Sequence, residues 1–308
     1  MPTRPAPVLA RWVAVCCAAL AAAACSEGSG GGGGRVEVVA TTYPLQYVVE
    51  RIGGAHVAVE GLVGTAGDGH RVELTPRQVG RLGEADLVVH VSGLQASTDA
   101  ALEPHGSGHV VDAADVAGLA GAPGRPPGEQ GSPALDPHFW LDPVRLASVA
   151  DQVATELTEV DPGHAVDHAA ASEALQADLA ALDAAYREGL AGCRGRTLVT
   201  SHEAFGYLAE RYGLVQVGIA GLDPAVEPSP ARLRDVVEVV EGRDVRTVFF
   251  EVSTGPGLTR ALADDLGLRT GVLDPVERVP ASGEDYLSTM RANLRALQEG
   301  LDCVPVGG

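Results

Sequence analysis

Four side chains that can bind a metal ion stand after predicted strands or loops, at similar intervals along the chain: His70, His138, His202 and Asp274. In open α/β sheets ligands bind beyond the carboxyl ends of the strands, so these side chains could meet at one site. Three imidazoles and one carboxylate suit tetrahedral Zn²⁺, whereas Mn²⁺ prefers more oxygen and the cuprous ion prefers sulfur. The sequence therefore predicts a zinc site built from these four residues.

Each candidate also has an ordinary structural explanation. His70 could be a solvated turn residue, His138 part of an aromatic plug, and His202 a helix cap. Asp274 before Pro275 is typical of a turn at a strand end. Only the combination favours metal binding. We do not expect an enzyme, because four protein ligands leave no coordination position for a reactive water.

Other histidines are expected to play smaller roles. His164 and His168 have the spacing of one helix face, but their polar surroundings favour exposure to solvent. His105 and His109 flank a glycine turn and could form a weak secondary metal site. Neither pair is expected to contribute to the main site.

Short β-branched segments alternate with helical patterns on both sides of a long central helix. Strands are predicted at residues 36–42, 56–63, 86–93, 109–114, 196–201, 214–219, 245–252 and 269–275. Helices are predicted at residues 43–54, 75–85, 143–160, 161–190, 202–213, 229–242, 256–266 and 284–301, with a long loop at 119–137. This alternation is typical of parallel α/β sheets, and the simplest assembly is two α/β lobes joined by one long helix.

The first residues form an export signal. Residues 1–24 combine two arginines with an apolar stretch that ends in alanines, and Cys25 follows directly. This order resembles a bacterial lipobox, which implies lipidation at Cys25 and a flexible Gly-rich tether over residues 25–35. Ala22 stands where lipoboxes usually have Leu, so secretion without a lipid remains an alternative.

Charge and composition exclude further classes of protein. A formal net charge of −19 repels phosphate backbones, which argues against nucleic-acid binding. The chain contains no lysine, which excludes a Walker A loop and any Schiff-base mechanism. Cys193 and Cys303 are the two cysteines after Cys25. In an exported protein they favour a disulfide over two separate buried thiols.

Five ordered segments together resemble the zinc- and manganese-type metal-binding lipoproteins that feed ABC transporters: TTYPLQYVVERIGG, GDGHRVELTPRQVGRLGEADLVV, DPHFWLDP, TSHEAFGYLAERYGL and GVLDP. The resemblance covers about residues 36–302. It implies two (β/α) lobes with parallel sheets, residues 36–160 and 193–308, joined by one long rigid helix over residues 161–192. It also implies a metal site in the interlobe cleft, with the family's ligands falling on the four candidates above. Histidine rather than glutamate at position 202 favours zinc over manganese.

The resemblance further implies a function. We expect an extracytoplasmic solute-binding protein that captures Zn²⁺ and delivers it to an ABC transporter permease and its ATPase for uptake. It would be a monomer, anchored to the cell membrane through Cys25, at the extracellular face or in the periplasm. The alternatives are a manganese or iron carrier of the same fold and a surface adhesin with a structural zinc. Many zinc members carry a His-rich loop in the first lobe, but residues 115–137 contain no histidine.

Residues beside the predicted ligands are expected to support them. Phe139 and Trp140 would form a dry wall around His138, and Glu73 and Glu251 could each orient an imidazole. Glycines 67 and 69 make the loop around His70 the segment expected to move when the metal is released.

Overall fold

The computed structural model describes residues 34–64, 69–105, 108–119, 135–252, 257–280 and 283–303. Residues Val36–Gly308 form one compact unit. The predicted signal at 1–24, the lipidation site Cys25 and most of the tether at 25–35 lie outside the described residues. Among the helices that are described, none combines the length and the apolar character needed to cross a membrane.

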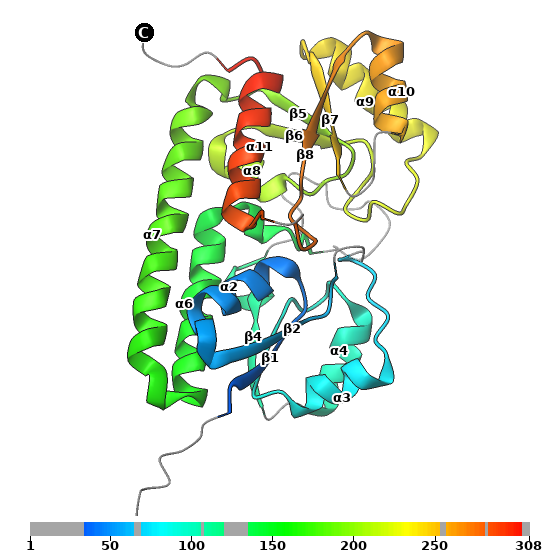
Figure 1. The fold of residues 1–308 in the computed structure, drawn as a ribbon. Coiled ribbons are helices and arrows are strands. Elements are labelled where there is room, and N and C mark those ends of the chain that lie inside the picture. The colour runs from blue at the N-terminus through cyan, green and yellow to red at the C-terminus, as the bar shows by residue number, and fades with distance from the viewer. Residues whose placement is uncertain are drawn as a thin grey trace, which may run out of the picture. The chain divides into compact units, whose positions relative to one another are not determined.

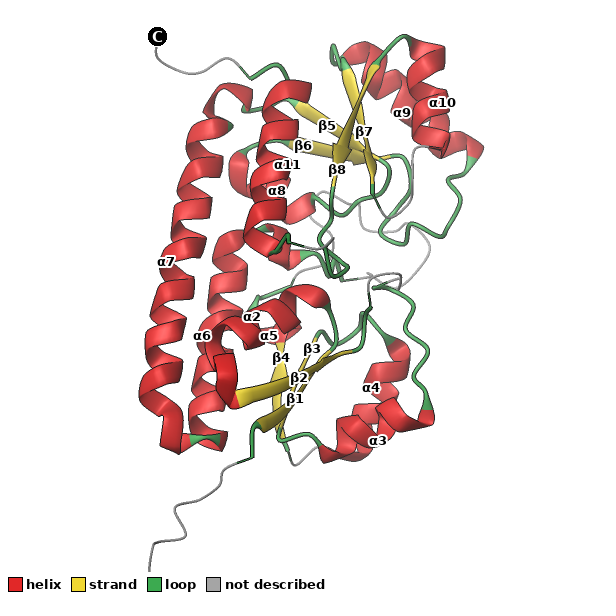
Figure 2. Cartoon of the chain, viewed as in Figure 1, coloured by secondary structure: helices red, strands yellow, loops and turns green. Residues whose placement is uncertain are grey.

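Two parallel four-stranded sheets organise the fold, one in each lobe (Figures 1 and 2). The first has the order β2-β1-β3-β4, from β1 (Val36–Ala40), β2 (Val57–Gly61), β3 (Leu87–His90) and β4 (His109–Asp112). The second has the order β6-β5-β7-β8, from β5 (Thr197–Thr200), β6 (Val215–Gly218), β7 (Thr247–Glu251) and β8 (Arg269–Leu273). Both sheets share one topology, and the predicted α/β class with two parallel sheets is confirmed.

Helices surround each sheet, as the apolar strands require for burial. The first lobe contains α2 (Tyr43–Gly53), α3 (Pro76–Glu84), α4 (Ala96–Leu102) and α5 (Ala113–Val116). The second contains α8 (Gly206–Tyr212), α9 (Pro230–Gly242), α10 (Gly257–Leu266) and α11 (Tyr286–Gly300). Two differences from the sequence prediction stand out. Residues 96–102 are helical although no helix was predicted there, and α8 begins at Gly206, so His202 lies in a loop rather than in a helix.

Two long helices lie side by side and support both lobes (Figure 1). α6 (Pro143–Val160) begins as predicted, because the Asp142 side chain accepts a hydrogen bond from the Val144 backbone N–H and Pro143 occupies the first helical position. α7 (Ala165–Gly189) corresponds to the predicted linking helix, and at 1.5 Å per residue it is about 37 Å long. It packs against α2 of the first lobe and α11 of the second. The domain boundaries at residues 160 and 193 stay a prediction.

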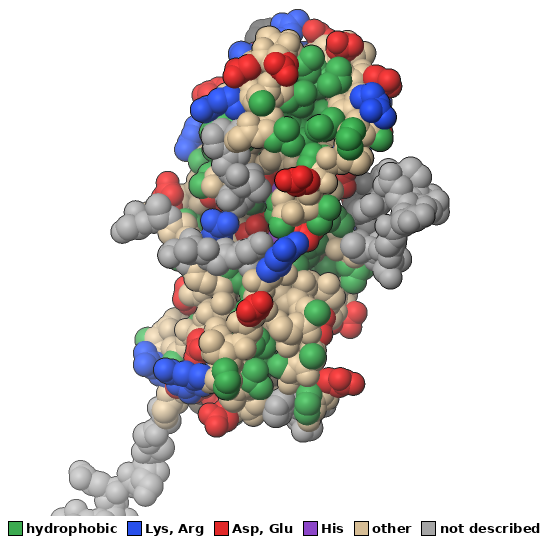
Figure 3. Space-filling view, turned by 90° about the vertical axis from the view of Figure 1, so that its right-hand side faces the viewer, with side chains coloured by type: hydrophobic (Ala, Val, Ile, Leu, Met, Phe, Trp, Pro, Cys, Tyr) green, Lys and Arg blue, Asp and Glu red, His purple; other side chains and the backbone are tan. Residues whose placement is uncertain are grey.

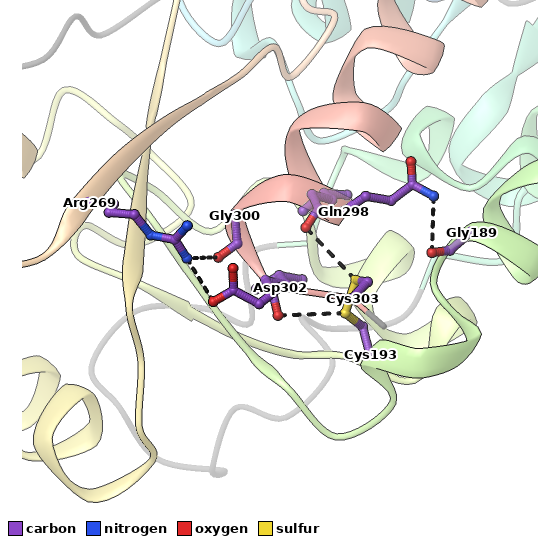
Figure 4. Close-up of a disulfide and its surroundings, with 9 residues drawn as sticks. Gly189, Cys193, Arg269, Gln298, Gly300, Asp302 and Cys303 are labelled. Carbon is purple, nitrogen blue, oxygen red and sulfur yellow. Dashed lines mark hydrogen bonds and ion pairs between the residues drawn. A yellow bond between two sulfur atoms is a disulfide. The ribbon is translucent and has the colours of Figure 1, made fainter. Parts of the chain in front are cut away.

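A disulfide ties the end of the chain to the second lobe (Figure 4). It joins Cys193 to Cys303, as predicted, and closes a loop with a sequence separation of 110 residues. Beside it the Gln298 side-chain amide donates to the Gly189 carbonyl at 3.2 Å. The end of α11 is therefore fixed to the segment that follows α7.

Candidate metal centre

Three histidines and one glutamate converge between the two sheets: His70, His138, His202 and Glu277 each offer one ligand atom, and these atoms lie within 4.8 Å of one another. Nε2 of His138 lies 3.3 Å from Nε2 of His70 and 3.0 Å from Oε1 of Glu277. Nε2 of His202 lies 3.5 Å from the same Glu277 oxygen. Two ligands bound tetrahedrally at about 2.05 Å from a zinc ion are about 3.3 Å apart. These donor separations of 3.0–3.5 Å are therefore close to those that zinc requires.

The predicted fourth ligand, Asp274, is not part of this cluster, so that prediction is wrong. Its Oδ1 accepts a hydrogen bond from the Val276 backbone N–H at 2.7 Å, which is the turn that Asp favours before Pro. Its backbone N–H and C=O are both bonded to the side-chain amide of Asn293 on α11. Because the Asp274 carboxylate closes its own turn, the next acid along the chain, Glu277, reaches the histidines instead.

Val276 directs Glu277 toward the cluster. It is fully buried and has a φ of 59°, in the left-handed region. For a β-branched residue this conformation is strained, at a cost of about 1–3 kcal/mol. The bend follows from tertiary packing, so the strand-end pattern used on the sequence could not reveal it. The Asp-Pro step was the available signal, since it indicates an aspartate already engaged in a turn.

His138 is oriented by a carboxylate two residues before it. Oδ1 of Asp136 accepts hydrogen bonds from Nδ1 of His138 at 2.8 Å and from its backbone N–H at 3.0 Å. Both side chains are buried. This contact fixes the proton on Nδ1 and leaves Nε2 for an ion. The sequence prediction missed this role for Asp136, although the Asp-Pro-His spacing was visible.

Aromatic side chains enclose His138 on the side away from solvent. The Trp140 ring centroid lies 5.4 Å from that of His138, and Phe139 packs against Trp140 at 5.5 Å. Both aromatic side chains are buried. The structure thus places Phe139 and Trp140 where a dry wall beside His138 was predicted.

His202 is oriented by Glu251, one of the two glutamates predicted to support a ligand. Glu251 ends β7 and His202 follows β5, and these strands are neighbours at the point where the strand order of the second sheet reverses. Glu251 accepts a hydrogen bond from the His202 backbone N–H at 3.1 Å and contacts Nδ1 of the ring. Among the described residues, Nε2 of His202 is buried without a hydrogen-bond partner, 3.5 Å from Oε1 of Glu277, which is costly unless an ion binds there. Glu73, the other candidate, is exposed and is not among the hydrogen-bond partners of the cluster.

His70 occupies the loop between β2 and α3 and is the most exposed member of the cluster, at 11% of its side chain. The buried side chain of Gln95 donates to the Gly69 carbonyl at 2.8 Å and so anchors this loop to the first lobe. Arg71 forms an exposed ion pair with Asp223 of the second lobe at 2.9 Å. A Cβ at position 69 would lie 3.4 Å from Cβ of Glu277, which is an ordinary van der Waals contact, so this loop packs directly beside Glu277.

The His138 segment is bonded to the second lobe by buried aromatic side chains. The Tyr207 hydroxyl donates to the Asp136 carbonyl at 3.1 Å, and the Trp140 indole N–H donates to the Pro275 carbonyl at 2.8 Å. The Tyr286 hydroxyl donates to the Trp140 carbonyl at 2.6 Å. His138 is therefore attached to the same framework as His202 and Glu277, whereas His70 is carried by the first lobe.

Carboxylates control the protonation of the cluster. Burial lowers the pKa of His138 and His202, but hydrogen bonds to acidic partners outweigh it. Asp136 and Glu277 raise the pKa of His138, and Glu251 and Glu277 raise that of His202 to about 10. Burial opposes ionisation of Glu277, yet its close contacts with the three histidines hold its pKa well below the usual value. An incoming metal ion must therefore displace protons.

One pocket in the second lobe has none of the four metal-binding residues in its lining. Its volume is about 460 Å³, and its lining in the second lobe is mainly apolar, including Ile219, Pro224, Val226, Pro228, Leu233 and Leu258. On the face shown in Figure 3 hydrophobic side chains gather over the second lobe, and almost no histidine surface is visible. His138, His202 and Glu277 are buried, so most of the metal-binding group is enclosed by protein.

The pair His164 and His168 differs from expectation. His168 is fully buried, with Nδ1 3.3 Å from the Ile52 carbonyl and Nε2 3.2 Å from Asp161. His164 stacks on His56 with ring centroids 3.8 Å apart. The prediction of a solvated face is wrong for His168, because the end of α2 packs over this part of α7, whereas the His164 side chain is 44% exposed.

A family model for the periplasmic component A of zinc-uptake complexes, ZnuA, matches residues 38–300. The zinc-binding lipoprotein AdcA of Streptococcus pneumoniae is 31% identical over 293 residues, covering 87% of this chain and 56% of that protein. The chain thus spans little more than half the length of that relative. The high-affinity zinc uptake system protein ZnuA of Bacillus subtilis is 30% identical over 280 residues, covering 87% of this chain and 88% of that protein.

Solved structures agree with these sequence matches. The zinc-bound ZnuA-like domain of Streptococcus pneumoniae AdcA superposes with a TM-score of 0.74 at 30% identity, covering 87% of this chain and all of that domain. The laminin-binding protein Lbp of Streptococcus pyogenes superposes with a TM-score of 0.75 at 30% identity, covering 87% of this chain and all of that chain.

Proposed function

This chain belongs to the ZnuA family of zinc-uptake complex components, and from that membership we propose that it captures Zn²⁺ outside the cytoplasm and delivers it to an ABC transporter permease for uptake. The observation that carries the proposal is the cluster of His70, His138, His202 and Glu277, whose donor atoms all lie within 4.8 Å of one another. Four protein ligands would close the coordination sphere, which suits a carrier rather than an enzyme.

We propose zinc as the cargo on the chemistry of the donors. Three imidazole nitrogens and one carboxylate oxygen match the preference of Zn²⁺, whereas Mn²⁺ favours more oxygen ligands. A manganese or iron carrier of the same fold is the alternative. An adhesin with a structural zinc is a second alternative, favoured by the similarity to the laminin-binding protein of Streptococcus pyogenes.

The cellular setting that we propose follows the sequence prediction. Cys25 would carry the lipid that holds the protein at the outer surface of the membrane, and residues 25–35 would act as the tether. The mature chain would work as a monomer with a permease and its separate ATPase. Processing of residues 1–24 is tested by mass spectrometry of the membrane-associated protein, in which an unmodified Cys25 would contradict lipidation.

Metal release, in this proposal, begins with His70. This ligand comes from the first lobe, whereas the other three are attached to the second, and Gly67 of its predicted mobile loop lies outside the described residues. Hydrogen exchange with and without zinc should show added protection across residues 64–72 in the loaded protein. Equal protection in both states would contradict a role for this loop.

Metal analysis and competitive titration of the chain lacking residues 1–25 test the whole proposal. We expect one tightly bound zinc ion that a strong chelator removes and that excess manganese does not displace. Manganese that persists against equimolar zinc would support the alternative carrier. Zinc that cannot be removed without unfolding the protein would instead indicate a structural ion.

A further inference from the structure

A second group of metal-binding side chains lies in the first lobe, outside the main cluster. His109 of β4 and two glutamates of α6, Glu156 and Glu159, each place one donor atom within 4.8 Å of the other two. Nδ1 of His109 is 2.9 Å from Oε2 of Glu156. The glutamates are three residues apart and therefore share one face of α6. Three donors from two separate elements thus converge.

This group is independent of the main cluster. His109 is the first residue of β4, at the amino end of the parallel sheet. The main cluster lies beyond the carboxyl ends of the strands, and therefore at the opposite end of this sheet. Substitutions in one group should therefore leave the other intact.

The charges around the second group are unbalanced. In the described part of the chain, neither glutamate forms an ion pair with an arginine, and the sequence has no lysine. Two carboxylates this close repel each other, and a divalent cation would remove that repulsion. The Gln152 side-chain amide donates to Oε1 of Glu156 at 3.1 Å, which leaves Oε2 facing His109. The glutamate is therefore held with one oxygen turned toward the imidazole.

We propose that His109, Glu156 and Glu159 form a second, weaker site for a divalent transition metal, with Zn²⁺ as the ion to test. One imidazole and two carboxylates are acceptable zinc ligands, and an all-oxygen ion such as Ca²⁺ would not use the imidazole. Three protein ligands leave at least one position for water. The His109 side chain is 44% exposed and Glu156 is 18% exposed, so bound metal exchanges readily with solvent.

Calorimetric titration of the mature chain with zinc chloride tests this site. The protein is first loaded with one equivalent of zinc, and further zinc should then produce a second, weaker binding event. His109→Ala and Glu156→Gln should each weaken the second event at least ten-fold and leave the first unchanged. Retention of the first event shows that each variant is folded.

His164→Ala is the matched control. His164 is also 44% exposed and also contacts an acid, Asp161, whose side chain is 17% exposed, at 2.8 Å. It lies outside the proposed site, so the second event should persist. The proposal is overturned if the native protein shows no second event, if His109→Ala retains it, or if His164→Ala abolishes it. His138→Ala separates the two proposals, since it should remove the first event and spare the second.

Discussion

Two imidazoles of the main cluster have one nitrogen committed to a carboxylate and the other directed at the ion position. Asp136 holds Nδ1 of His138, and Glu251 holds Nδ1 of His202. Such outer partners fix the tautomer and raise the basicity of the ligand nitrogen. Zinc affinity should therefore depend on residues that never touch the metal.

Substitution of these outer carboxylates measures that dependence. Asp136→Asn and Glu251→Gln should each lower zinc affinity by about 10- to 100-fold, because the imidazole loses its acceptor and its fixed orientation. Competition against a zinc chelator of known affinity provides the measurement. Glu73→Gln, which changes an exposed acid, is the control and should retain full affinity.

The identity of the fourth ligand is tested by a matched pair of substitutions. Glu277→Gln removes a charged ligand and should lower zinc affinity by roughly 100-fold or more. Asp274→Asn keeps an oxygen that can accept the Val276 hydrogen bond, so its effect should stay below about three-fold. Chelator competition on both variants shows whether Glu277 or Asp274 is the fourth ligand. The reverse order of effects would restore Asp274 as the ligand.

Zinc affinity should rise with pH. The pKa of His202 is raised to about 10, so in the metal-free protein this ring is protonated at pH 7 and must lose a proton to bind zinc. The raised pKa of His202 also stabilises the metal-free fold. This contribution is fully present below about pH 6.5, the ordinary histidine pKa, and is lost as the pH rises toward about 10. Between these two pH values the stability of the metal-free protein should fall while its zinc affinity increases.

Calorimetry in two buffers with different ionisation enthalpies checks this directly, since it counts the protons released. At least one proton per zinc ion is expected at pH 7. Binding without proton release would show that the histidines are already neutral.

At the scale of elements, much of the site could be anticipated from where strands end. His202 after β5 and Glu251 at the end of β7 follow the rule for parallel sheets. The capping pair Asp142-Pro143 marks the start of α6 correctly. α4 was missed although its sequence ASTDAAL contains three alanines, because seven residues with Ser, Thr and Asp among them are too few to show a helical apolar period. Glu277 was missed because its direction depends on the buried bend at Val276.

α11 connects two constraints on the second lobe. The Asn293 side chain of α11 donates a hydrogen bond to the Asp274 carbonyl, in the bend that leads to Glu277. The disulfide of Cys303 lies just after the C-terminal end of α11. Cys193→Ser together with Cys303→Ser should destabilise the fold by about 4–5 kcal/mol in the chain-entropy model. Denaturant unfolding of the two forms measures this difference. Because the cysteines lie away from the metal ligands, zinc affinity at low temperature should be unchanged, and a large loss would contradict this view of α11.

At the scale of the whole molecule, the two lobes are joined by buried and exposed contacts of different kinds. Tyr207, Trp140 and Tyr286 form buried hydrogen bonds that hold the His138 segment to the second lobe. Arg71 and Asp223 form an exposed ion pair beside His70. Exposed ion pairs contribute little free energy and are screened by salt. The contact beside His70 should therefore break before the buried hydrogen bonds do.

Arg71→Ala tests the exposed contact. Zinc should dissociate about two- to five-fold faster, as the loss of an exposed ion pair implies, and the native rate should itself increase with ionic strength. Stopped-flow mixing with excess chelator gives both rates. Arg246→Ala removes a comparable exposed pair with Asp244 at the start of β7, at the opposite end of that strand from Glu251, and should not change the rate.

If the chain delivers zinc as proposed, the hydrogen bonds that hold the His138 segment to the second lobe have a consequence for delivery. Should His70 withdraw first, the ion would stay bound to His138, His202 and Glu277, with one coordination position vacant. A donor group of the recipient could enter that position before the remaining bonds break. Transfer would then proceed by stepwise ligand substitution, and zinc would pass to the recipient without becoming a free hydrated ion.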